Sequence, residues 1–148
     1  METDVNIFLI EDDDLDAEIF ERGLRKAKAP VSLVRARDGA EALDMLTDAS
    51  VAITLPRPHI ILLDINMPRM NGHEFLAALR ANGALSTERV FVFTTSSNRK
   101  DIDRAYANNA SGYIVKPNGA SEMRAVLDLL GKYWDLCEHP GDETVSAA

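Results

Sequence analysis

Short apolar runs alternate with amphipathic segments along most of the chain. Five runs contain many β-branched and aromatic residues and span only five or six positions, which is typical of strands buried on both faces. They are Val5–Ile10, Val31–Ala36, Ile60–Ile65, Val90–Thr94 and Gly112–Lys116. Because a helical pattern follows each run, the sequence predicts an α/β fold with a parallel sheet covered by helices on both faces.

Between these strands, apolar residues recur at the three- and four-residue spacing of amphipathic helices. The predicted helices lie at about 15–26, 40–46, 73–81, 99–108 and 121–137. The segment 48–58 is irregular and is predicted to be a loop, and the small, polar tail at 140–148 is predicted to be disordered. We therefore expect one domain across residues 1–148, with its core at about 5–136.

The composition narrows the class of protein. The net charge of -8 and the pI of about 4.8 argue against a nucleic-acid-binding protein, which needs a basic face. Cys137 is the only cysteine, so a disulfide framework within the chain is excluded and a reducing compartment is expected. The sequence contains neither a signal-peptide pattern nor a membrane-spanning apolar stretch, so a cytoplasmic protein is expected.

Polar residues stand at the carboxyl ends of four predicted strands, where chemistry concentrates in parallel α/β sheets. They are Glu11, Asp12 and Asp13 after the first strand, Asp64 in the third, Thr94 and Thr95 at the fourth, and Lys116 at the fifth. If the strands are parallel, these ends share one edge of the sheet. Carboxylates, a hydroxyl and an ammonium would then converge there.

A divalent cation would make such an acidic cluster stable. Two carboxylates ~4 Å apart repel by roughly 4 kcal/mol at an effective dielectric constant near 20. Because Glu11, Asp12 and Asp64 offer hard oxygen ligands, Mg²⁺ or Mn²⁺ fits better than Zn²⁺. The alternative is that the acidic run only caps the first helix, which we expect for Asp13 or Asp14.

A carboxylate at a strand end beside a metal ion suits nucleophilic attack on a phosphoryl group. Lys116 would supply a cation for a phosphate oxygen, and Thr94 a hydrogen-bond donor. The alternatives are a surface lysine and a threonine that merely favours a strand.

Four motifs resemble, in their order and spacing, those of the receiver domain of bacterial response regulators. They are LIEDDD, LLDINMPRMNG, FTTS and GYIVKP, and the resemblance covers roughly residues 5–134. The resemblance implies a flavodoxin-like, CheY-like fold with strand order 2-1-3-4-5 and five helices. It implies that Asp64 is the phosphoacceptor and that Lys116 contacts the phosphoryl group. Mg²⁺ would be held by Asp12, Asp64, the backbone carbonyl of Asn66 and, through water, Glu11. Thr94 and Tyr113 would form the switch, and Pro68 and Gly72 would shape the loop after the third strand.

Finer features resemble stand-alone receivers, some of which serve bacterial phytochrome histidine kinases. These features are PRP in the long loop, TTS after the fourth strand, and KYWDLCEHP near the end. Thr95 departs from the small residue usual at its position, and Ser96 lacks the acid or amide that guides water in some receivers. Together with Asn66, these two residues are expected to tune the reaction.

The resemblance implies a single-domain response regulator of a two-component or phosphorelay system, catalysing only its own phosphotransfer and slow dephosphorylation. The expected partners are a sensor histidine kinase, such as a bacteriophytochrome or another photosensor, a histidine phosphotransfer protein, and a second copy of the chain. No DNA-binding output is expected. Trp134, Leu136 and Cys137 are expected either to extend a dimer contact or to cap the protein's own core.

Two other functions use similar residues. A phosphatase of the haloacid dehalogenase type also places an aspartate at a strand end with Mg²⁺, but it needs a second aspartate two residues later. Asn66 stands at that position here. The other alternative is a binding module that no longer accepts phosphate. The intact set of site residues disfavours it, namely Glu11, Asp12, Asp64, Thr94 and Lys116.

Overall fold

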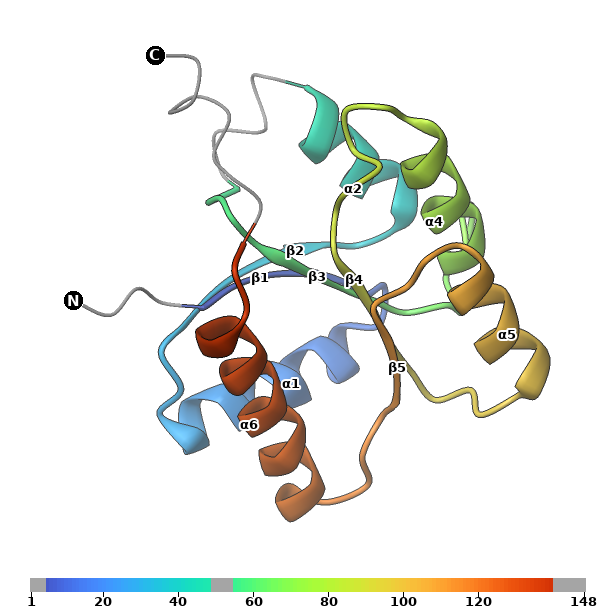
Figure 1. Ribbon diagram of the computed structural model, residues 1–148. Helices are drawn as coiled ribbons and strands as arrows, with labels where there is room; N and C mark the ends of the chain where they lie inside the picture. The colour runs from blue at the N-terminus through green and yellow to red at the C-terminus, as the bar shows by residue number, and fades with distance from the viewer. Residues whose placement is uncertain (1–4, 49–54, 140–148) are drawn as a thin grey trace, which may run out of the picture.

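The computed structural model describes residues 5–48 and 55–139, which form a five-stranded parallel sheet between two layers of helices (Figure 1). The elements are β1 (Val5–Ile10), α1 (Asp14–Ala27), β2 (Val31–Ala36), α2 (Gly39–Thr47), β3 (Ile60–Leu63), α4 (Gly72–Ala81), β4 (Val90–Thr94), α5 (Arg99–Ala107), β5 (Gly112–Val115) and α6 (Ala120–Leu136). The strand order is β2-β1-β3-β4-β5. The expected fold class and topology are therefore confirmed. The predicted disorder at 140–148 and most of the predicted loop lie outside the described residues.

Two apolar cores hold the sheet between its helices. One core lies under α2, α4 and α5, and the other under α1 and α6, as the two helix layers in Figure 1 show. All four residues of β3 have no exposed surface, because this strand lies between β1 and β4 and is covered on both faces. Its position is consequently the most constrained in the sheet.

The order of the strands places the ends of β1 and β3 side by side. The chain leaves β1 toward β2 on one side and returns to form β3 on the other, which creates the switch point where α/β proteins bind ligands. In the register of this pair, Ile10 lies opposite Leu63. Glu11 and Asp64, which directly follow these two strands, therefore emerge together at one edge of the sheet.

Two strands end earlier than predicted. β3 ends at Leu63 rather than at Ile65, and β5 ends at Val115 rather than at Lys116. The backbone of Asp64 still donates to Ile10, but Ile65 then accepts from Met67 and Gly72 across a tight turn instead of pairing with a strand. Asp64 and Lys116 thus stand just beyond the ends of their strands.

Helix caps account for two of the polar residues near this edge. Asp13 caps α1 and accepts hydrogen bonds from the backbone of Leu15 and Asp16, as the capping alternative expected. Asp38 caps α2 and also pairs with Arg69. Of the acidic run after β1, Asp13 therefore caps a helix, and other acids of the run remain available for the site.

The end of α6 mainly covers the protein's own core. Trp134 is 6% exposed and packs in the core under α1 and α6, whereas Leu136 is 83% exposed and Cys137 is also exposed. Of the two expectations for this segment, capping of the core describes Trp134, and the other two residues lie at the surface. Within the described residues, no helix is both long and apolar enough to cross a lipid bilayer.

Candidate metal centre and phosphoacceptor site

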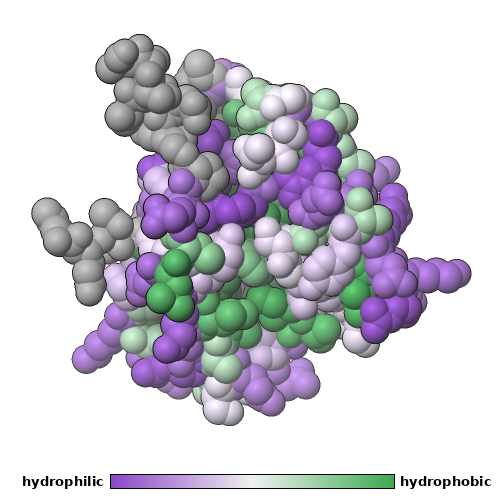
Figure 2. All heavy atoms as spheres, in the orientation of Figure 1, coloured by the Kyte–Doolittle hydropathy of each residue, from purple (hydrophilic) through white to green (hydrophobic). Residues whose placement is uncertain are grey.

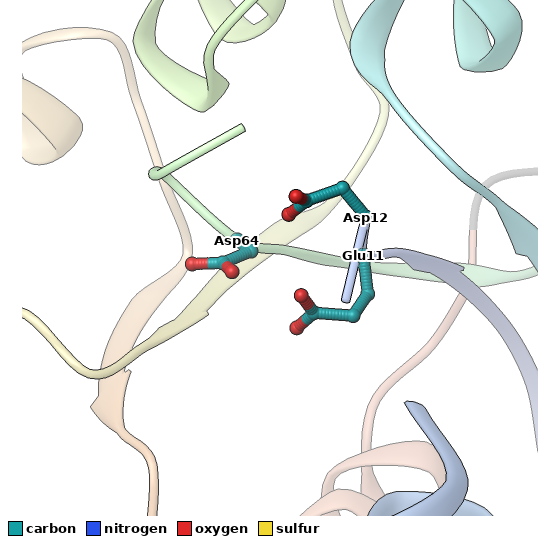
Figure 3. A group of neighbouring side chains, drawn as sticks. All are labelled: Glu11, Asp12 and Asp64. Atoms are coloured by element: carbon teal, nitrogen blue, oxygen red, sulfur yellow. The ribbon is translucent and has the colours of Figure 1, made fainter. Parts of the chain in front are cut away.

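The carboxylates of three residues that follow β1 and β3 lie close together, with those of Glu11 and Asp12 extending toward Asp64 (Figure 3). One oxygen each from Glu11, Asp12 and Asp64 lies within 4.8 Å of the other two. Glu11 and Asp64 are almost fully buried, and Asp12 is half-buried. Three hard oxygen ligands at one point are suited to Mg²⁺ or Mn²⁺, so these residues could hold such an ion.

Lys116 contacts two of these three carboxylates and one further acid. Its Nζ is 2.6 Å from Oε1 of Glu11, 2.9 Å from Oδ2 of Asp16 and 3.3 Å from Oδ2 of Asp64. Proximity of Lys116 to Asp64 was expected from the sequence, but the contact with Asp16 was not. The acidic run ending at Asp16 was the only signal for it, and that run does not show which acid turns toward the site.

The pKa values of Glu11 and Lys116 are both raised at this site, for different physical reasons. Burial raises the pKa of the Glu11 carboxyl to about 7, with a further rise from the charge of Asp64, although the hydrogen bond from Lys116 opposes it. Burial would lower the pKa of Lys116, but hydrogen bonds to Asp16 and Glu11 and the charge of Asp64 raise it above its ordinary value. Lys116 therefore stays cationic.

The raised pKa of Glu11 predicts a stability that depends on pH in the metal-free protein. The carboxyl loses its proton near pH 4.5 in the unfolded chain but near pH 7 in the folded one. Because the folded state binds more protons between these values, its stability falls as the pH rises through this range. We expect Glu11→Gln to lose this pH-dependent decrease in stability and to be more stable than the wild type above about pH 7. Urea unfolding of both proteins in a chelator measures the difference, and parallel pH curves would contradict the prediction.

Thr94 on β4 and Tyr113 on β5 belong to the strands next to the carboxylate cluster, whose edge of the sheet is called the acidic edge below. Thr94 ends β4 with no exposed surface, and the Tyr113 hydroxyl donates a 2.8 Å hydrogen bond to the backbone oxygen of Ser96. The side chain of Ser96 is engaged elsewhere, since it donates to Asp101 on α5 at 2.6 Å. Thr95 is exposed. Tyr113 thus connects β5 directly to the segment that follows Thr94.

A buried histidine joins this segment to α4, and sequence reasoning missed it. Nε2 of His73 lies 2.9 Å from Oδ1 of Asp101. The hydrogen bond from Ser96, followed by that with His73, lowers the pKa of the Asp101 carboxyl. The start of α4, the segment after β4 and α5 are thereby linked through one carboxylate.

The other residues expected at the site lie in the loop after β3. Asn66 is exposed, and its backbone N–H lies 3.4 Å from Oδ1 of Asp64. Gly72 begins α4, and its N–H donates to Ile65 at 2.9 Å. The structure therefore brings Glu11, Asp12, Asp64 and Lys116 into one cluster, with Thr94, Asn66 and Tyr113 on the adjoining segments.

Comparisons with known proteins agree with this arrangement. The family model of the response regulator receiver domain matches residues 7–128 of the chain. The chain is 30% identical to the response regulator Rcp1 of Synechocystis over 86% of this chain and 87% of Rcp1. It is 31% identical to the probable methanogenesis regulatory protein FilR2 of Methanothrix harundinacea over 86% of this chain and 82% of FilR2.

Solved structures support the same relationship. The phosphorylated cyanobacterial phytochrome response regulator RcpA superposes with a TM-score of 0.80 at 30% identity, over 94% of this chain and all of that one. The Mn²⁺-bound form of Rcp1 superposes with a TM-score of 0.78 at 28% identity, over 93% of this chain and 99% of that one. The chain belongs to the response regulator receiver domain family, and phytochrome response regulators are among its structural relatives.

Proposed function

We propose that this protein accepts a phosphoryl group onto Asp64 from the phosphohistidine of a sensor kinase. The observation that carries the proposal is the position of Asp64, a buried carboxylate within 4.8 Å of two other acids and 3.3 Å from Lys116. An oxygen of Asp64 would attack phosphorus as the bond from phosphorus to the donor nitrogen breaks, and that nitrogen keeps the electron pair.

The remaining residues would stabilise charge and report the change. Mg²⁺, held by Asp12, Asp64 and the backbone carbonyl of Asn66, with Glu11 acting through water, would neutralise charge on the phosphoryl oxygens. Lys116 would contact one phosphoryl oxygen and the hydroxyl of Thr94 another. Because Tyr113 is bonded to the segment following Thr94, a movement of Thr94 would reach the surface of β5.

The proposal is tested by incubation with acetyl phosphate, followed by intact-protein mass spectrometry and peptide mapping. We expect one phosphoryl group on Asp64 in Mg²⁺ and none in a chelator. Accumulation of the labelled protein also separates this function from that of a phosphatase, which would release inorganic phosphate in many turnovers. An unlabelled protein in Mg²⁺ would overturn the proposal.

We expect Lys116→Ala to keep the fold in Mg²⁺ but to lose the conformational response to phosphorylation. The metal ion compensates for the acids that Lys116 leaves, whereas nothing replaces its contact with the phosphoryl group. Amide chemical shifts of α5, β5 and α6 before and after labelling measure the response. A response equal to that of the wild type would contradict the role of Lys116.

The relatives of the chain support a proposal for the phosphoryl donor. The phytochrome response regulators among the relatives support a photoreceptor histidine kinase as the donor, acting in the cytoplasm directly or through a histidine phosphotransfer protein. Phosphotransfer from each histidine kinase of the same genome would identify it. Transfer only from kinases without a photosensory domain would contradict this part.

The readout face proposed for the output comprises α5, β5 and α6. Apolar surface gathers between α6 and β5 on the face seen in Figure 2. Tyr106, Val115 and Leu129, one from each element, are about half exposed. Because exposed apolar surface favours association, we propose a homodimer through this face. Light scattering with and without acetyl phosphate tests it.

A further inference from the structure

Among the described residues that pair with Lys116, Asp16 is the one acid that comes from a helix rather than from the end of a strand. It lies in the first turn of α1, and its Oδ2 is 2.9 Å from Nζ of Lys116. An ammonium group has three N–H donors, and Glu11, Asp16 and Asp64 each face Nζ with one oxygen. All three donors are therefore used, and the contact with Asp64 is the longest.

A phosphoryl group on Asp64 would require Lys116 to change one of these partners. Glu11 is 2% exposed in its side chain, so its release would leave a buried carboxylate without its cation. The side chain of Asp16 is 35% exposed, so water can replace the ammonium there. Asp16 is accordingly the partner that Lys116 can leave at the lowest free-energy cost.

We propose that Asp16 is a positioning residue that holds Lys116 away from Asp64 and thereby slows phosphorylation. The inference rests on the proposed function, because it concerns the rate of the same reaction. In the transition state, negative charge spreads over three phosphoryl oxygens, and Lys116 stabilises it only as far as its ammonium is free to approach. Without the carboxylate of Asp16, the ammonium group of Lys116 would pair with Glu11 and Asp64 only. It would then already be directed at the reacting group.

The test compares Asp16→Asn with Asp14→Asn and the wild type. Asp14 lies in the same turn of α1 and carries the same charge, but it contacts Arg35 and Arg37 instead of Lys116. At saturating Mg²⁺, we expect Asp16→Asn to be labelled by acetyl phosphate about threefold to tenfold faster than the wild type, the effect of one partly exposed charged hydrogen bond. Asp14→Asn should keep the wild-type rate.

A spectroscopic signal distinguishes positioning from a merely structural effect. The ¹⁵N resonance of Lys116 Nζ should move in unphosphorylated Asp16→Asn and stay in place in Asp14→Asn. Labelling of Asp16→Asn at or below the wild-type rate would overturn the inference, and so would an equal acceleration in Asp14→Asn, which would indicate a general charge effect. Failure of the wild type itself to label would instead overturn the proposed function, and this inference with it.

Discussion

The Asp64→Asn variant is expected to take up no phosphoryl group from acetyl phosphate or from a kinase. An amide oxygen is a far weaker nucleophile than a carboxylate, so we expect the labelling rate to fall by at least about a hundredfold. The fold should be retained, because asparagine has nearly the same shape and the bond from the backbone of residue 64 to Ile10 does not involve the side chain. Intact-protein mass spectrometry and circular dichroism measure the two outcomes.

The matched control for this variant is Asp103→Asn. Asp103 is an exposed acid on α5 whose partner is Arg99, so its loss removes the same charge far from the carboxylate cluster. It should be labelled at the wild-type rate. Wild-type labelling of Asp64→Asn would show that the phosphoryl group is attached to another residue, and the assignment of Asp64 would then be wrong.

The position of the acidic edge was predictable because strand ends can be read from apolar runs. The run before Asp64 predicts a buried strand, and all its residues from Ile60 to Leu63 are indeed fully buried. The pattern alone does not say which strands are neighbours. The pairing of β1 with β3, which brings Glu11 beside Asp64, came from the resemblance of the motifs to a known family.

The contacts made by helices could not be predicted in the same way. Which acid of the run 11–16 faces Lys116 depends on the rotation of α1 about its axis, and a capping acid cannot be distinguished from a site acid by residue type alone. Asp13 caps the helix, whereas Asp16, one turn later, reaches the ammonium. His73 and Asp101 are 28 positions apart, and neither belongs to a motif that would connect them.

Gly72→Ala is expected to lower the free energy of unfolding by about 3 kcal/mol or more, the upper range for overpacking. A Cβ at this position would overlap the carbonyl oxygen of Asp64 and lie 2.7 Å from Cα of Ile65. Both contacts are with backbone, which cannot turn aside as a flexible side chain can. The start of α4 would have to move away from the end of β3, breaking the bond from the Gly72 N–H to Ile65. The displaced turn also carries Asp64, so the folded fraction should be labelled more slowly by acetyl phosphate.

Two other glycines provide controls with the opposite expectation. In the part of the chain that the structure describes, a Cβ at Gly83 or at Gly131 would meet nothing within 4 Å. Gly131 lies inside α6, where alanine favours the helix by about 0.8–1.0 kcal/mol, so Gly131→Ala should be slightly more stable than the wild type. Urea unfolding of the three variants measures the contrast. If Gly72→Ala unfolds at the same urea concentration as Gly83→Ala, the close approach of α4 to the Asp64 backbone does not constrain the site.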